Sequence, residues 1–187
     1  MYETSDFRNG LKIEYDNQPF VIVEFQHVKP GKGAAFTRTR IKNLITGRVL
    51  QPTFKSGEKV GKPDVEEKTM QFLYVEGTDL TLMDTTTYDQ VAIPKEQIGE
   101  PGQFLKENME VQVLFWNGKP INVDLPLHVN LKITETEPGV RGDTATNATK
   151  AATTETGARI NVPLFINEGD VIRVDTRTGE YVERVNS

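Results

Sequence analysis

The sequence predicts an all-β protein built from small barrels or sandwiches. Many short runs rich in β-branched and aromatic residues follow one another, separated by turns that contain Gly, Asn or Pro. Only residues 94–108 have a plausible helical composition, and Gly99, Pro101 and Gly102 limit that stretch to short helical turns. Apolar residues make up 36% of the chain, which suits several small cores better than one large core.

The first strands are predicted at 11–15, 19–28, 34–44 and 48–54. LKIEY (11–15) alternates apolar and polar residues, and a turn at residues 16–19 leads into the Val- and Phe-rich run 19–28. Residues 34–44 alternate again, with basic side chains at every second position, so period two puts Arg38, Arg40 and Lys42 on one face. Thr46-Gly47 provides the next turn.

The remaining strands are predicted at 69–77, 80–84, 90–93, 109–116, 121–125, 128–137, 159–166, 170–176 and 180–185. Asn117-Gly118 and Thr178-Gly179 join neighbouring strands as tight hairpin turns, because glycine accepts a positive φ. Residues 138–157 are rich in Gly, Thr and Ala and are predicted to form a long loop of the kind that is often functional. No internal repeat is evident in the sequence.

Charge and proline positions divide the chain into three pieces, at 1–64, 65–128 and 129–187. The first piece has 11 basic and 7 acidic residues, the second 4 and 11, and the third 7 and 9. Residues 29–62 hold nine basic residues against Glu58 alone. A basic patch on an otherwise acidic chain indicates an oriented electrostatic surface and argues against indiscriminate binding of nucleic acid.

The usual signs of catalysis are missing. The chain has no cysteine, and its two histidines, His27 and His128, fall in different pieces. Lys32 follows a glycine but lacks the phosphate-loop spacing. We expect no catalytic residue, no metal and no cofactor. With no signal-peptide pattern and no apolar run of about 18 residues, we expect a cytoplasmic protein without membrane contact.

The loop VKPGKGAAF (28–36) lies between the predicted strands 19–28 and 34–44. Pro30 and Gly31 occupy the second and third positions of a turn over 29–32, which are the type II preferences. The two strands then pair as a hairpin with Lys32 near its tip. A phosphate backbone that follows the basic stripe Arg38, Arg40 and Lys42 would be steered toward this lysine.

Five segments carry a family resemblance: DFRNG (6–10), VKPGKGAAF (28–36), TFKSGEKV (53–60), ETEPGVRGDTA (135–145) and KAATTETGARINVPLFINEG (150–169). With these motifs in order and at the right spacing, the sequence resembles the bacterial translation elongation factor P family over essentially its whole length. The resemblance implies a KOW/SH3-like barrel followed by two OB-fold barrels, in an L shape similar to tRNA.

The resemblance also implies a function. Family members bind the ribosome between the peptidyl and exit tRNA sites and relieve stalling at consecutive prolines. Lys32 then matches the tip residue that receives a post-translational addition from a modifying enzyme, and the acceptor end of peptidyl-site tRNA would meet the residues Lys29, Pro30, Gly31, Lys32, Gly33, Arg38, Arg40 and Lys42.

Further contacts follow from the same resemblance. The C-terminal residues Arg141, Gly142, Asp143, Thr144, Tyr181 and Arg184 are expected near the mRNA codon of the exit site or nearby RNA. We expect a monomer that contacts both ribosomal subunits, with a basic ribosomal protein beside the acidic middle piece. Two alternatives stay open: a generic single-stranded RNA-binding OB-fold protein, which needs exposed aromatics on a basic groove, and an unmodified paralogue of the family.

Overall fold

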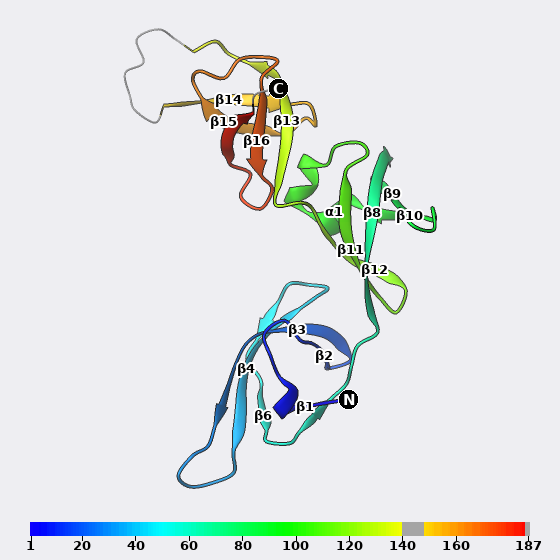
Figure 1. Cartoon of the computed structure of the whole chain (residues 1–187), viewed down its shortest axis with the longest axis vertical. Coiled ribbons are helices and arrows are strands. Elements are labelled where there is room, and N and C mark those ends of the chain that lie inside the picture. Colours follow the sequence, from blue (N-terminus) through cyan, green and yellow to red (C-terminus); the bar gives the residue numbers. More distant parts are fainter. Residues whose placement is uncertain (140–147, 186–187) are drawn as a thin grey trace. The chain divides into compact units, whose positions relative to one another are not determined.

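The computed structural model describes residues 1–139 and 148–185, which form an all-β protein with only short helical turns (Figure 1). This confirms the predicted fold class. Two compact units make up the described chain: Met1–Lys68 with Val113–Asn122, and Thr69–Gln112 with the residues from Val123 onward. No described helix is long and apolar enough to cross a membrane.

The N-terminal barrel contains β1 to β7. Its main sheet has the order β2-β3-β4-β5, and a further strand, β6, also pairs with β4. The elements are β1 (Tyr2–Glu3), η1 (Thr4–Asp6), β2 (Lys12–Tyr15), β3 (Gln18–Val28), β4 (Phe36–Asn43), β5 (Val49–Leu50), β6 (Thr53–Lys55) and β7 (Lys59–Val60). Alternate strand residues turn inward and form one apolar core around Ile13, Phe20, Ile22, Ile41 and Phe54.

The predicted strand 48–54 is wrong as a single element, because it divides into β5 and β6. Pro52 lies between the two pieces and has no N–H to donate to a strand ladder. Its carbonyl oxygen instead accepts hydrogen bonds from the Thr39 amide at 3.1 Å and the Thr39 hydroxyl at 2.7 Å. The chain therefore stays against β4 through the break.

The middle barrel is a five-stranded sheet in the order β10-β9-β8-β11-β12. Its strands are β8 (Val65–Glu76), β9 (Asp79–Asp84), β10 (Gln90–Pro94), β11 (Glu110–Trp116) and β12 (Lys119–Asp124). The predicted helical stretch is confirmed as two short turns, α1 (Lys95–Ile98) and η2 (Glu100–Phe104). Strand β8 begins at Val65, four residues before the predicted strand 69–77, and its first residues are mostly charged.

The C-terminal barrel is a five-stranded sheet in the order β15-β14-β13-β16-β17. Its strands are β13 (His128–Thr136), β14 (Thr149–Thr154), β15 (Arg159–Pro163), β16 (Val171–Asp175) and β17 (Tyr181–Val185). The predicted loop 138–157 is wrong over its second part, because β14 pairs there with β13 and β15. The inward-facing Ala152 and Thr154 are small, so the apolar alternation that marks a strand is weak.

The same type of turn recurs once in each barrel, although no repeat is evident in the sequence. Asn43, Asp84 and Asp175 each end a strand and accept hydrogen bonds through Oδ1 from the amides two and three residues later, at 2.7–2.8 Å and 3.1–3.3 Å. The amide four residues later bonds to the carbonyl oxygen of the same residue at 2.8–2.9 Å. If Asn43, Asp84 and Asp175 are counted as position one, position four is a threonine in each turn. Its hydroxyl oxygen accepts a hydrogen bond from the amide of position six.

The second unit has a core contributed by segments far apart in the sequence. Phe104, from η2, is 1% exposed and lies in the apolar cluster of the C-terminal barrel, with Leu131, Ile133 and Ile172. Its ring also lies 3.5 Å from the position that a Cβ atom at Gly179 would occupy. The Lys106 ammonium and the Glu155 carboxylate are 3.0 Å apart. Although partial burial raises the Glu155 pKa, the Lys132 amide and the Lys106 ammonium outweigh it and lower that pKa overall.

We expect Phe104→Ala to destabilise the second unit by about 3–5 kcal/mol, because it leaves a cavity in a closed apolar core. Urea unfolding followed by circular dichroism measures this loss. Phe165→Ala is the matched control, since that ring is 57% exposed. Equal stability of the two variants would show that the Phe104 ring contributes no core packing.

Candidate nucleic-acid interface

Strands β3 and β4 run past the rest of the N-terminal barrel as a two-stranded ribbon that ends in a loop (Figure 1). Their ladder extends to the pair Val28 and Phe36, which leaves residues 29–35 as the loop. Lys32 is the central residue of this loop and is exposed. The structure therefore confirms the predicted hairpin with Lys32 at its tip.

The predicted type II turn over residues 29–32 is wrong. That turn needs a positive φ at Gly31, but in this loop the positive φ, 98°, belongs to Gly33. A Cβ at Gly33 would meet nothing within 4 Å, so the backbone conformation, and not space, favours glycine there. On the returning side, the Ala35 carbonyl accepts the Ser56 amide at 3.1 Å, which ties the loop to the chain after β6.

The predicted basic stripe on β4 is confirmed as a surface feature. Thr37, Thr39 and Ile41 are 1%, 6% and 0% exposed, and they face the barrel interior. The intervening residues Arg38, Arg40 and Lys42 are exposed on the opposite face. Because the side-chain period of a strand is two, the buried set fixes the outward direction of the basic set.

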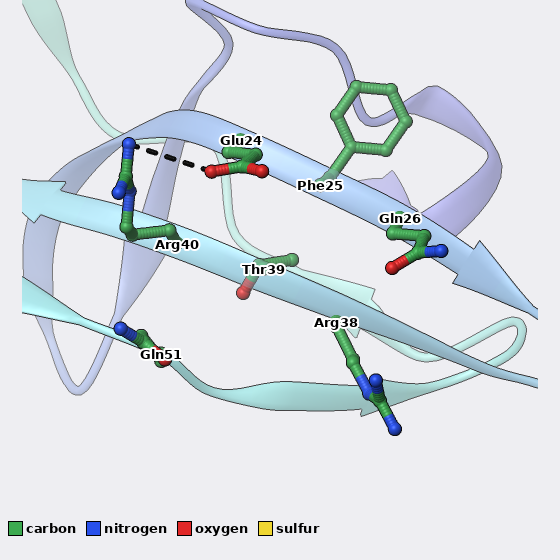
Figure 2. Close-up of a pocket in the computed structure, with 7 residues that line it drawn as sticks. All are labelled: Glu24, Phe25, Gln26, Arg38, Thr39, Arg40 and Gln51. Atoms are coloured by element: carbon green, nitrogen blue, oxygen red, sulfur yellow. Dashed lines mark ion pairs between the residues drawn. The ribbon is translucent and has the colours of Figure 1, made fainter.

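An acidic residue that the pattern along β4 does not reveal lies beside this stripe. Glu24 on β3 lies opposite Arg40 on β4, and the Arg40 Nη2 atom is 3.5 Å from the Glu24 Oε2 atom (Figure 2). Gln26 lies opposite Arg38 in the same way. Glu24 and Arg40 are each four residues from the last ladder pair, so the hairpin register could have identified them as partners.

Arg38 and Arg40 of the stripe border a hollow of about 240 Å³ (Figure 2). Its lining residues are Glu24, Phe25, Gln26, Arg38, Thr39, Arg40 and Gln51. Lys55 on β6 pairs with Phe36, so it adds a further cation near the loop, which is not among the predicted site residues. The Arg38 guanidinium carbon lies 5.4 Å from the centre of the Phe36 ring, which supports the arginine on an aromatic surface.

The predicted C-terminal site residues fall into two groups. Arg141, Gly142, Asp143 and Thr144 lie outside the described residues. Tyr181 and Arg184 both lie on β17. Tyr181 packs against the C-terminal core, and its burial raises its pKa above the ordinary value of about 10. The Arg184 guanidinium carbon lies 5.5 Å from the centre of the exposed Phe165 ring.

Chemically, the β4 face offers fixed positive charge. Its guanidinium and ammonium groups are donors that match phosphate oxygens, and they lie along the strand that follows the loop holding the exposed Lys32. His27 is held on the same ribbon, with its Nδ1 atom 2.8 Å from the Thr37 hydroxyl oxygen. Within residues 1–139 and 148–185, no cluster of three or more His, Asp or Glu side chains is placed to hold a metal ion.

Comparison with known proteins accounts for all three barrels. Residues 3–60 match the family described as the Elongation factor P (EF-P) KOW-like domain. Residues 65–123 match the EF-P OB domain, and residues 129–184 match Elongation factor P, C-terminal. The chain belongs to the elongation factor P family. The resemblance inferred from the sequence motifs is thereby confirmed, with the KOW-like domain and the middle OB domain that it implied.

Full-length relatives agree. The chain is 55% identical over 186 residues to elongation factor P of Bdellovibrio bacteriovorus, covering 100% of this chain and 99% of that protein. It is 54% identical to elongation factor P of Natranaerobius thermophilus, covering 99% and 98%. These relatives are named as elongation factors, so the chain is a member of a family of translation factors.

Solved structures show a related fold. Translation initiation factor 5A from Methanococcus jannaschii superposes with a TM-score of 0.55 and 24% identity, covering 64% of this chain and 88% of that chain. An initiation factor 5A family protein from Naegleria fowleri gives a TM-score of 0.54 and 17% identity, covering 66% and 96%. At this identity the likeness supports the arrangement of strands alone.

We expect Glu24→Gln to strengthen binding of the isolated protein to a short single-stranded RNA severalfold at low salt. The substitution removes the carboxylate that holds Arg40 and leaves its guanidinium for phosphate. The logarithmic salt dependence should steepen by about 0.7, the contribution of one added phosphate contact.

Fluorescence anisotropy across a salt series measures both effects. Glu3→Gln is the matched control, because it makes the same change in net charge at another exposed pair, with Lys59 at 4.0 Å. An equal gain from both variants would mean that only net charge matters and that Glu24 has no local effect on Arg40.

Proposed function

We propose that the protein binds the ribosome between the peptidyl and exit tRNA sites and stimulates peptide-bond formation at consecutive prolines, with Lys32 positioning peptidyl-tRNA. The observation that carries the proposal is the exposed Lys32 at the centre of the loop that ends the β3–β4 ribbon. Membership of the elongation factor P family supports it.

In this proposal the protein positions peptidyl-tRNA and takes no part in the bond-forming reaction. Proline has a rigid ring that restricts the geometry of peptide transfer. An arm that holds the CCA end of peptidyl-tRNA in a reactive orientation lowers the entropic part of the barrier, and the ribosome supplies the reaction itself. A factor of this kind needs no acid, base or nucleophile of its own, in keeping with the lack of a catalytic motif in the sequence.

The basic face supports the tRNA contact. Lys29, Arg38, Arg40 and Lys42 would neutralise phosphates of the acceptor end, while Pro30, Gly31 and Gly33 shape the loop that presents Lys32. The glycines beside Lys32 also leave room for a modifying enzyme that extends the lysine. We further propose that the chain acts as a monomer in the cytoplasm, with domains at 1–64, 65–128 and 129–187.

The C-terminal domain completes the proposed binding mode. Arg141, Gly142, Asp143 and Thr144 would approach the exit-site codon of the mRNA or nearby RNA, with Arg184 and Tyr181 as additional contacts. The generic single-stranded RNA-binding alternative is less well supported. It needs exposed rings on the basic groove, whereas the strongly exposed aromatic residues of the described chain, Tyr74, Tyr88 and Phe165, lie outside residues 29–62.

We expect Lys32→Ala to fold normally, because the exposed Lys32 side chain does not pack in the core. We expect it to lose rescue of proline-stalled ribosomes, because the amine that would position peptidyl-tRNA is removed. In vitro translation of a Pro-Pro-Pro reporter measures rescue, and thermal unfolding checks the fold. Lys62→Ala, another exposed lysine of the same barrel, is the control and should retain rescue. Full rescue by Lys32→Ala would defeat the proposed function.

Intact mass spectrometry of the protein from its native host identifies any addition to Lys32.

We expect the double charge reversal Arg38→Glu and Arg40→Glu to weaken ribosome binding in a salt-dependent way. Loss of two phosphate contacts should flatten the logarithmic salt dependence by about 1.4–1.8. The control pair Lys59→Glu and Lys62→Glu makes the same change in net charge elsewhere on the barrel. Sedimentation with purified ribosomes at several salt concentrations decides the matter, and an unchanged salt slope in the Arg38 and Arg40 variant would exclude the stripe from the interface.

A further inference from the structure

The turn that recurs in the three barrels differs at its fifth position. Gly47 and Gly179 occupy that position in the N-terminal and C-terminal copies, with φ of 77° and 74°. The middle barrel has Tyr88 there, with φ of 65°. The hydrogen bonds of the three turns are otherwise equivalent, and the amides of all three residues bond to the carbonyl oxygen four residues earlier at 2.8–2.9 Å.

A tyrosine at positive φ is strained. The left-handed region crowds the Cβ atom of any residue but glycine, and a bulky side chain there is uncommon. Among the described residues, the other non-glycine residues with positive φ are Asp16, Asn17, Asn108 and Asn117, which are the types that tolerate it best. Tyr88 is therefore the exception in the part of the chain that the structure describes.

Burial does not compensate for this strain. Tyr88 is 71% exposed, so its ring gains little from packing within the protein. The turn does not need the ring either, because the same hydrogen bonds form around glycine in the other two barrels. Strain at an exposed residue that the fold does not require points to a role outside the fold.

Charge identifies the kind of partner. Residues 65–128 carry 11 acidic residues and 4 basic ones, so phosphate groups would be repelled from the middle barrel. An exposed carboxylate residue, Asp89, follows Tyr88 directly. A Lys or Arg side chain would be attracted both by the Tyr88 ring and by the Asp89 carboxylate, whereas that carboxylate would repel the phosphates that flank an RNA base.

We propose that Tyr88 is a docking residue for a Lys- or Arg-bearing protein segment of the ribosome, with its ring presented by the strained turn. This inference rests on the proposed function, because the partner is sought on the ribosome. It assigns the middle barrel an aromatic contact with a basic protein, in addition to the RNA contacts of the N-terminal barrel.

Tyr88→Gly separates binding from folding. Glycine relieves the strain, so the thermal midpoint of unfolding should rise by about 2–4 °C. Affinity for purified bacterial ribosomes should fall about threefold to thirtyfold through loss of the cation–π contact. Tyr88→Phe keeps the ring and should bind nearly as the wild type. The control Tyr74→Thr removes a ring that is 48% exposed on the same barrel and should leave affinity unchanged.

Photocrosslinking identifies the partner. Benzoylphenylalanine in place of Tyr88 should form an adduct with a Lys- or Arg-rich segment of a ribosomal protein, read by mass spectrometry. An adduct with ribosomal RNA alone, or none, overturns the inference. Unchanged affinity of Tyr88→Gly, or an equal loss in Tyr74→Thr, also overturns it while leaving the proposed function intact. Wild-type protein that fails to bind ribosomes would defeat the proposed function and this inference together.

Discussion

The register of the β3–β4 ladder is the constraint on which the candidate site depends. The buried residues Thr37, Thr39 and Ile41 hold one face of β4 against the core, and this leaves Arg38, Arg40 and Lys42 on the outside. A slip of one residue would bury three charges and expose the core face, at a cost far above that of any single surface contact. The same register sets the ends of the loop, and Lys32 lies at its centre because the last pair joins Val28 and Phe36.

Side-chain alternation made the long strands predictable from the sequence, and it failed where small or mixed residues carry a strand. The stripe on β4 follows directly from its period of two. Strand β14 was missed because Ala152 and Thr154, although buried, give little apolar contrast with their neighbours. The pairing of Glu24 with Arg40 requires the register between two strands, which composition along one strand does not supply.

Backbone conformation in turns was the second feature that the sequence alone did not predict. The Pro30-Gly31 dipeptide indicated a type II turn, but a loop of several residues has other ways to reverse direction, and here the positive φ falls at Gly33. The recurring turn was missed for a related reason. Its shared residues are a carboxylate or amide at the start and a threonine three residues later, as in Asn43 and Thr46, and the shared property is a set of hydrogen bonds to backbone amides. Such a pattern is short and recurs at irregular spacing, so it is recognised only once the bonds are seen.

The uneven distribution of charge along the chain determines which part of the protein attracts a polyanion. Basic residues dominate residues 29–62, whereas the piece at 65–128 is strongly acidic, so a polyanion is attracted to one part of the chain and repelled by another. A uniformly basic protein of this size would bind RNA in many orientations. Under the proposed function, acidic residues elsewhere in the chain would disfavour encounters with phosphates other than those made through the β3–β4 ribbon. The net charge of −5 is therefore compatible with RNA recognition, because orientation depends on where the charges lie and not on their sum.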